Sequence, residues 1–154
     1  MKASAKLRMA IREEETFSAK VYDDGNGVAT QGWGHTGPDV AFGNPDCDLK
    51  KAQLWFDVDI VKAEREVDRL VKVTITQGMY DALVSFEFNC GGLEFLVDKK
   101  PRPSRALIAL NERRWNDAAE ELIKWNTDGG KDRRGLLSRR AREILFYTSE
   151  KYPT

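Results

Sequence analysis

Residues 11–36 read IREEETFSAKVYDDGNGVATQGWGHT. Four glycines between positions 25 and 34 exclude a helix and indicate tight turns between short strands, with Val21-Tyr22 and residues 28–31 as the apolar segments able to pair. The helical spacing of apolar residues in 3–14 predicts a first amphipathic helix that ends near Glu15. We therefore expect carboxylates from a helix end and from a neighbouring hairpin to face each other across a groove.

The middle of the chain predicts two strong helices. Asp48 is a good N-cap, and apolar residues recur every three or four positions from there to about residue 71, which predicts a helix of some six turns. Residues 71–75 are expected to form an extended linker. Thr76 can cap the next helix, 77–89, which is the most apolar segment and ends at Gly91-Gly92.

The last third is predicted to be helical, with loops between the helices. Residues 93–103 contain Lys-Lys-Pro-Arg-Pro and are expected to form a basic surface loop. Short helices are expected from Ser104 through 110 and around 115–125, followed by a loop with Gly129-Gly130. A final helix, 136–149, is expected to carry its arginines on a polar face. The fold class is α+β, mostly α, with one small antiparallel sheet in the first third.

Composition limits the classes of protein that this chain can represent. Its 154 residues, 41% hydrophobic and 32% charged, fit one globular domain, and no apolar run approaches the roughly 20 residues of a membrane span. The N-terminal residues lack the apolar core of a secretory signal. Residues 1–98 hold 11 Lys+Arg and 17 Asp+Glu, whereas residues 99–154 hold 14 and 8. The basic part could face an anionic polymer, or these charges could be ordinary solvated helix faces.

The chain has two cysteines, Cys47 and Cys90, and one histidine. This count excludes a Cys/His metal cluster of standard spacing, and we expect neither a metal nor a cofactor. Cys90 lies in an apolar segment and is expected to be a buried small hydrophobe. Cys47 lies in a polar loop, and the sequence leaves open whether the two pair.

Two carboxylates suit the cleavage of a glycosidic bond. That reaction needs one carboxyl group to protonate the leaving oxygen and an ionised one across the sugar. Glu15 and Asp24 could supply this pair, and Thr30, six residues after Asp24, could hold a water molecule near it. The alternative is that these acidic residues are only solvated charge and turn formers.

The order and spacing of these residues resemble a known family. Glu15, Tyr22, Asp24 and Thr30 are followed by Gly-Trp-Gly-His-Thr at 32–36, as in the bacteriophage T4-type lysozymes, the endolysins of glycoside hydrolase family 24. The resemblance continues through residues 77–91, QGMYDALVSFEFNCG, and through 135–143, GLLSRRARE. It therefore spans most of the chain.

The resemblance implies a fold of two lobes in a single catalytic domain, residues 1–154. A small lobe with an antiparallel sheet is expected at about 15–55, and a helical lobe at about 1–14 and 70–154. The long helix, at about 48–71, is expected to join them.

It also implies roles for individual residues. Glu15 matches the general acid, Asp24 the opposite carboxylate, and Thr30 the residue that helps to place the attacking water for inversion at the anomeric carbon. The chain departs from the family at Thr16, where glycine is usual, after a run of three glutamates. Only Glu15 keeps the spacings to Asp24 and Thr30, and Glu14 is the alternative acid.

The remaining residues of the pattern are expected to support the site or to touch the substrate. His35 is expected to hydrogen-bond to a carboxylate beneath the site, and Gly32 and Gly34 to let the backbone pass close to the catalytic carboxylates. Trp33 could be a sugar platform or part of the core. The arginines near the C-terminus could pair on the surface or hold peptide carboxylates. The candidate saccharide contacts are Thr36, Phe88, Asn89 and Ser104.

The function that the resemblance implies is hydrolysis of the β-1,4 bond between N-acetylmuramic acid and N-acetylglucosamine in bacterial peptidoglycan. The alternatives are a lytic transglycosylase and a non-catalytic wall-binding phage module on the same fold. We expect a monomer with no nucleic-acid partner and no stable membrane association. It is expected to stay in the host cytoplasm until a holin releases it to the periplasmic cell wall.

Overall fold

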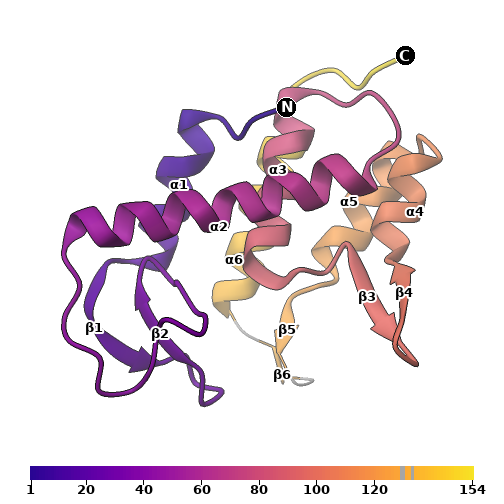
Figure 1. Ribbon diagram of the computed structural model, residues 1–154. Helices are drawn as coiled ribbons and strands as arrows, with labels where there is room; N and C mark the ends of the chain where they lie inside the picture. Colours follow the sequence, from indigo (N-terminus) through magenta and orange to yellow (C-terminus); the bar gives the residue numbers. More distant parts are fainter. Residues whose placement is uncertain (129–130, 133) are drawn as a thin grey trace. The chain divides into compact units, whose positions relative to one another are not determined.

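The computed structural model describes residues 1–128, 131–132 and 134–154. Helices dominate, and three two-stranded antiparallel sheets accompany them (Figure 1). The elements are, in chain order, α1 Ala5–Glu15, β1 Ser18–Asp23, β2 Ala29–Gly32, α2 Leu49–Leu70, α3 Gln77–Cys90, β3 Glu94–Val97, β4 Lys100–Pro103, α4 Arg105–Asn111, α5 Trp115–Ile123, β5 Thr127–Asp128, β6 Lys131–Asp132 and α6 Arg134–Tyr147.

The predicted α+β class, mostly α, is confirmed, as are the helices and their caps. Asp48 Oδ1 accepts a hydrogen bond from the Lys51 amide at 2.7 Å at the start of α2. Thr76 caps α3 by accepting from the Met79 amide, and Gly91 ends this helix in a left-handed conformation. These short polar side chains and one glycine satisfy backbone groups that each helix end would otherwise leave without partners.

The expectation of a single sheet was wrong. The segment predicted to be a basic loop forms the hairpin β3–β4, in which Phe95 pairs with Arg102 and Val97 pairs with Lys100. A third hairpin, β5–β6, follows α5. Proline-rich strands are not recognised by strand propensity, because proline is depleted in sheets except at edges. Gly129 and Gly130, predicted to lie in a loop, fall outside the described residues.

Contacts group the chain into two compact units, one of Met1–Ser4 with Ala63–Thr154 and the other of Ala5–Lys62. The second unit includes α1, which the sequence had assigned to the helical lobe. Side-chain bonds from α1 to α2 explain this grouping: Arg12 Nη2 donates to Gln53 Oε1 at 2.5 Å, and Arg8 Nη1 pairs with Asp57 Oδ1 at 3.1 Å.

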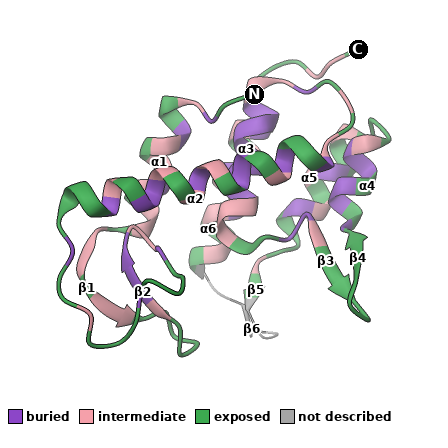
Figure 2. Ribbon diagram, in the orientation of Figure 1, coloured by how far each residue is buried: buried purple, intermediate pink, exposed green. Residues whose placement is uncertain are grey.

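Each unit has its own buried residues. In the unit of Ala5–Lys62, a small core of Val40, Cys47, Ala52 and Trp55 supports the hairpin β1–β2. In the other unit, α3 is buried over most of its length, from Gly78 to Phe86 (Figure 2). A β-carbon on Gly78 would lie 2.3 Å from the Phe146 carbonyl oxygen, so glycine permits the close packing of α3 against α6.

The expectation that Cys90 is buried was wrong. Cys47 is buried, and Cys90 is exposed at the end of α3; both are free thiols. The described helices include none with the length and apolar character that a bilayer span requires.

Candidate active site

Glu15 is the last residue of α1, where the chain leaves the helix to enter the hairpin. The amide of Thr16 still donates to the Arg12 carbonyl at 3.1 Å, and Thr16 then turns the chain with a φ of +52°. This left-handed conformation favours glycine and is uncommon for a β-branched residue. Thr16 therefore holds a conformation that glycine would adopt at lower cost.

Arg12, three residues before Glu15 in α1, packs against two aromatic rings. The guanidinium carbon of Arg12 lies 4.7 Å from the centre of the Phe56 ring and 5.2 Å from that of Trp33. Trp33 also contacts Phe17, with ring centres 5.4 Å apart. Trp33 is therefore part of the packing beneath the end of α1, which favours the core role among its two predicted roles.

The backbone of Gly34 passes directly beside the Glu15 carboxylate. A β-carbon built on Gly34 would lie 2.7 Å from Glu15 Oε2, and Gly34 has a φ of +76°. Any side chain at this position would displace the carboxylate, so the expected close approach is found here. A β-carbon on Gly32 would instead meet Ala52 and Trp55 of α2. The expected approach to a catalytic carboxylate is therefore not found at Gly32.

Asp24 lies in the turn that joins β1 to β2. Its Oδ1 accepts hydrogen bonds from the amides of Asn26, at 2.8 Å, and Val28, at 3.2 Å. The neighbouring Asp23 accepts from the amides of Gly25 and Gly27, both at 2.8 Å. The turn is thus ordered by two aspartates. Asp24 is exposed, with its second oxygen outside these turn bonds.

Tyr22 links the two carboxylates. It lies opposite Thr30 in the hairpin register and two residues before Asp24 in the chain. The pKa of Tyr22 is raised, first by burial of the phenol and then by the negative charges of Glu15 and Asp24. The charges of both carboxylates therefore reach the same phenol, which is consistent with one candidate site at the helix end and the turn.

Thr30 is buried opposite Tyr22, and its hydroxyl donates to the Val28 carbonyl at 3.1 Å. Its oxygen lone pairs remain able to accept a hydrogen bond. Thr36, a predicted saccharide contact, is exposed just after His35.

His35 is hydrogen-bonded to carboxylates, as expected. Its Nδ1 lies 2.6 Å from Asp59 Oδ2, and its Nε2 lies 3.2 Å from Asp39 Oδ1. The ring stacks on Trp55 with centres 4.7 Å apart, and the Trp55 indole donates to Asp39 Oδ2 at 2.7 Å. Burial raises the pKa of Asp39. Hydrogen bonds from His35, from its own backbone amide and from Trp55 together lower it by more than burial raises it, so the pKa is below its ordinary value.

Three of the predicted saccharide contacts lie in the other unit. Asn89 Oδ1 accepts a hydrogen bond from Arg140 Nη2 at 2.5 Å, near the end of α3. Ser104 is buried and caps α4 by accepting from the Leu107 amide at 3.1 Å. Phe88 is half-buried. Asn89 and Ser104 thus have structural partners, and their contact with saccharide stays a prediction that this placement does not favour.

Arg140 was expected on the polar surface of the last helix, and this was wrong. It is buried, its Nε lies 3.0 Å from Glu143 Oε2, and Glu143 Oε1 accepts from the Ser85 hydroxyl at 2.8 Å. The guanidinium also stacks on Phe86 at 4.9 Å. An arginine can be buried when it is paired, and although Glu143 lies at the helical i+3 spacing, the sequence pattern did not show that this pair is buried.

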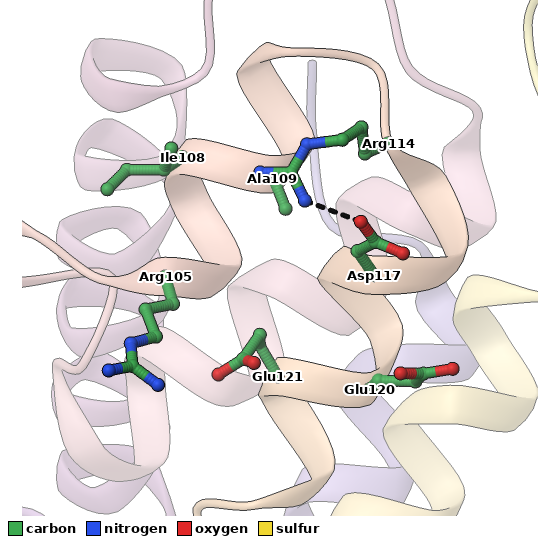
Figure 3. Close-up of a pocket in the computed structure, with 7 residues that line it drawn as sticks. All are labelled: Arg105, Ile108, Ala109, Arg114, Asp117, Glu120 and Glu121. Carbon is green, nitrogen blue, oxygen red and sulfur yellow. Dashed lines mark hydrogen bonds and ion pairs between the residues drawn. The ribbon is translucent and has the colours of Figure 1, made fainter.

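A surface pocket of about 230 Å³ lies between α4 and α5, in the same unit. Figure 3 shows the Arg114 guanidinium directed to the Asp117 carboxylate, and the two groups are 2.5 Å apart. Arg114 also pairs with Glu112, and Glu121 pairs with Lys124. These charges neutralise one another at an exposed surface, and none of the predicted site residues lines the pocket.

Comparison with known proteins identifies the family. The family model described as phage lysozyme matches residues 12–143. The chain belongs to the phage lysozyme family. The matched segment begins before Glu15 and ends at Glu143, so it includes every residue of the predicted site.

Individual members of the family are similar over different lengths. The endolysin of Salmonella phage P22 is 34% identical over 143 residues, which cover 90% of this chain and 92% of the relative. The endolysin of Bacillus phage B103 is 41% identical over 125 residues, 79% of this chain, but the match covers only 44% of its length. The chain thus spans less than half of the Bacillus phage endolysins that it matches.

A solved structure agrees with the fold. The endolysin from Escherichia coli O157:H7 phage FAHEc1 superposes with a TM-score of 0.80 at 29% identity and covers all of this chain and 98% of that one. The lysozyme-like fold predicted from the sequence is therefore confirmed.

Sequence reasoning missed some supporting residues of this phage lysozyme fold. Asp39, Trp55 and Asp59 surround His35, yet the sequence pattern indicated Asp39 only as part of a loop and Trp55 only as an apolar helix position, and Asp59 was not singled out. Asp59 lies one helical turn after Trp55, which places the two on the same face of α2. That spacing was the only signal available for the pair.

Proposed function

We propose that this chain is an endolysin muramidase of the T4-type, in glycoside hydrolase family 24. It hydrolyses the β-1,4 bond between N-acetylmuramic acid and N-acetylglucosamine in bacterial peptidoglycan and thereby lyses the host cell. The observation that carries the proposal is the close approach of the Glu15 carboxylate, at the end of α1, to Gly34; the charges of Glu15 and Asp24, which both raise the pKa of Tyr22 in addition to its burial, support it.

In the proposed mechanism Glu15 is the general acid and donates its proton to the leaving glycosidic oxygen. Asp24 stays ionised on the opposite side of the sugar, where its free oxygen stabilises the oxocarbenium-like transition state or accepts a proton from water. Thr30 accepts a hydrogen bond from the attacking water, since its own proton is directed to the Val28 carbonyl. Attack from the side opposite the leaving group inverts the anomeric carbon.

The supporting groups keep this geometry rigid. Asp24 Oδ1 is fixed by two turn amides, which leaves the other oxygen for the reaction. Gly34 leaves room for the Glu15 carboxylate, and the cluster of His35, Trp55, Asp39 and Asp59 supports the segment that carries Gly34. Thr36 is a candidate saccharide contact because it is exposed beside this segment.

We further propose that the protein works as a monomer on peptidoglycan and needs no cofactor. It stays in the host cytoplasm until a separate holin opens the membrane, and it then acts on the periplasmic wall. The similarity to the phage P22 endolysin over nearly the whole of both chains supports a role in lysis.

Mass spectrometry of digested peptidoglycan tests the proposed reaction. Purified sacculi treated with the protein should release muropeptides with reducing ends. Anhydro-muramic ends would instead show a lytic transglycosylase, and wall binding without released fragments would show a non-catalytic module. The Glu15→Gln protein is the control for contaminating hydrolases.

A further inference from the structure

The β3–β4 hairpin, residues 94–103, exposes apolar side chains to solvent. Phe95 is 42% exposed, Leu96 73% and Val97 42%. Figure 2 shows the hairpin as largely exposed, in contrast to α3 beside it in the chain. Phe95 and Val97 lie on one face of the hairpin and Leu96 on the other, so both faces of the hairpin expose apolar side chains, as is common at interaction sites.

Cations follow these apolar residues on the second strand. The hairpin holds three cations, Lys99 in the turn and Lys100 and Arg102 on β4, and two carboxylates, Asp98 in the turn and Glu94, which pairs with Arg69 at the base. Within the described part of the chain, no ion pair is recorded for these three cations. In the register of the hairpin, Phe95 lies opposite Arg102 and Val97 opposite Lys100, so each of these apolar side chains has a cation as its cross-strand neighbour.

Trp125 extends the apolar surface. Its ring centre lies 6.4 Å from that of Phe95, and the residue is 36% exposed. The other side of the indole contacts the Phe86 ring, at 5.5 Å, so one edge of Trp125 is anchored in the core and the other reaches solvent. Tryptophan in this half-buried state is typical of membrane interfaces.

The hairpin is held firmly at its base. The Ser104 amide donates to the Leu93 carbonyl at 2.8 Å, and Arg69 Nη2 pairs with Glu94 Oε1 at 2.7 Å. Its two turn residues, Asp98 and Lys99, have φ values of +51° and +61°, as in the tight turn that matches the twist of a hairpin. The apolar and cationic side chains are thus presented in one fixed arrangement.

We propose that the 94–103 hairpin, together with Trp125, adsorbs the protein reversibly to anionic lipid bilayers. The apolar side chains of β3 and the exposed edge of Trp125 enter the interface, while Lys100 and Arg102 contact lipid phosphates. Combined apolar burial and attraction to anionic headgroups is how peripheral proteins bind membranes. This inference goes beyond the proposed hydrolysis and does not depend on it.

The composition of the hairpin favours lipid over the other possible partners. Residues 94–103 contain no Ser, Thr, Asn, Gln, Tyr or His, so all of their polar side chains are charged, which suits an anionic surface better than a neutral sugar. A second copy of the chain would bring the same cations together. Pro101 and Pro103 also remove amide donors from β4, which disfavours pairing of its edge with another strand.

Vesicle co-flotation of the full chain tests the proposal. Protein should float with phosphatidylcholine vesicles that contain about 30% anionic phosphatidylglycerol, and not with vesicles of phosphatidylcholine alone. Leu96→Ser should lower the partition coefficient about tenfold. The double variant Lys100→Gln/Arg102→Gln should lower the partition coefficient tenfold or more, because each Lys or Arg near an anionic membrane surface strengthens binding about fivefold.

Matched variants separate this surface from general effects. Leu145→Ser changes a leucine that is 72% exposed elsewhere, on α6, and Lys50→Gln/Lys151→Gln removes two other exposed cations. These variants should float like the parent protein. Melting temperatures should confirm that all variants are folded.

Three results would overturn the proposal. The first is that the parent protein does not float with anionic vesicles. The second is that Leu96→Ser and Leu145→Ser lower the partition coefficient equally. The third is that the hairpin variants still bind vesicles but no longer bind purified sacculi. The last result would assign the hairpin to the wall polymer. Binding to sacculi is measured in the Glu15→Gln background so that digestion does not interfere.

Discussion

The Oε2 atom of Glu15 lies 2.7 Å from the point that a β-carbon on Gly34 would occupy. Real β-carbons do not approach an oxygen this closely, so Gly34→Ala must displace the carboxylate. Because a misplaced general acid transfers its proton poorly, we expect Gly34→Ala to lower the rate of peptidoglycan hydrolysis by about a hundredfold. The decrease in turbidity of a sacculus suspension measures this rate.

Gly25→Ala is the matched control for backbone strain. Gly25 also has a positive φ, +96°, but no atom lies within 4 Å of its added β-carbon. Both substitutions strain the backbone, and only the one at Gly34 meets the carboxylate. Equal losses of activity in the two variants would show that strain, and not the displacement of Glu15, is the cause.

Thr16→Gly should stabilise the protein. A non-glycine residue in the left-handed region costs about 1–2 kcal/mol, and the greater freedom of glycine in the unfolded chain offsets part of the gain. We expect the free energy of unfolding to rise by about 1 kcal/mol with activity retained, measured by urea denaturation. Arg113→Gly, at a φ of +59°, should behave alike. A folded but inactive Thr16→Gly protein would show that the site depends on the threonine.

The buried pair of Arg140 and Glu143 should be sensitive to loss of one partner. Glu143→Gln leaves the Arg140 charge buried without its counterion and weakens its hold on Asn89, so we expect a loss of about 3–5 kcal/mol in unfolding free energy. Asp117→Asn, in the exposed pair with Arg114, should cost less than about 1 kcal/mol. Similar costs at both sites in chemical denaturation would argue against the burial of Arg140.

The tyrosines predict how stability depends on alkaline pH. Burial raises the pKa of Tyr147 well above its ordinary value, with the neighbouring Tyr152 as a smaller cause. A pKa that is higher in the folded state favours the protonated, folded form. This contribution is complete below the unfolded pKa of about 10 and is lost as the pH rises towards the folded value. Tyr147→Phe should therefore lose less stability than the parent between neutral pH and pH values above about 10.

Tyr80→Phe provides the comparison at neutral pH. Burial likewise raises the pKa of Tyr80, but its hydroxyl donates to the Met1 carbonyl at 3.1 Å. The Tyr147 hydroxyl has no hydrogen-bond partner among the described residues. At neutral pH we therefore expect Tyr80→Phe to cost about 1 kcal/mol and Tyr147→Phe almost nothing. Unfolding curves at both pH values measure both effects, and the reverse order would contradict the account.

Much of the fold could be predicted because local chemistry decides it. Asp48, Thr76 and Ser104 each precede an apolar helical pattern, and each caps a helix in the structure. The long helix and the glycine-rich hairpin were also found at the expected positions. In these segments the sequence pattern and the tertiary structure require the same conformation.

The remaining features depend on contacts between distant residues. The 94–103 hairpin turns at Asp98 and Lys99, without a glycine, and its second strand holds two prolines, so neither turn nor strand has the usual signal. The burial of Arg140 depends on Glu143 and on Asn89 of another helix. Glu143 lies three residues after Arg140 on α6 and could be read from helical spacing, but Asn89 is 51 residues away, and no local pattern shows that the pair is buried against α3.

The candidate site shows the same division. The spacing of Glu15, Asp24 and Thr30 was readable, and so was a glycine at position 34. The joint effect of Glu15 and Asp24 on Tyr22, and the cluster around His35, required coordinates. Their roles in catalysis remain predictions.

The most direct test of the central claim compares the hydrolysis rates of Glu15→Gln and Glu14→Gln on purified peptidoglycan. The two variants remove one negative charge each from adjacent residues at the end of α1. If Glu15 is the general acid, its variant should be slower by about a thousandfold or more, while Glu14→Gln keeps a rate close to that of the parent. A folded Glu15→Gln protein that retains the parent rate would contradict the account.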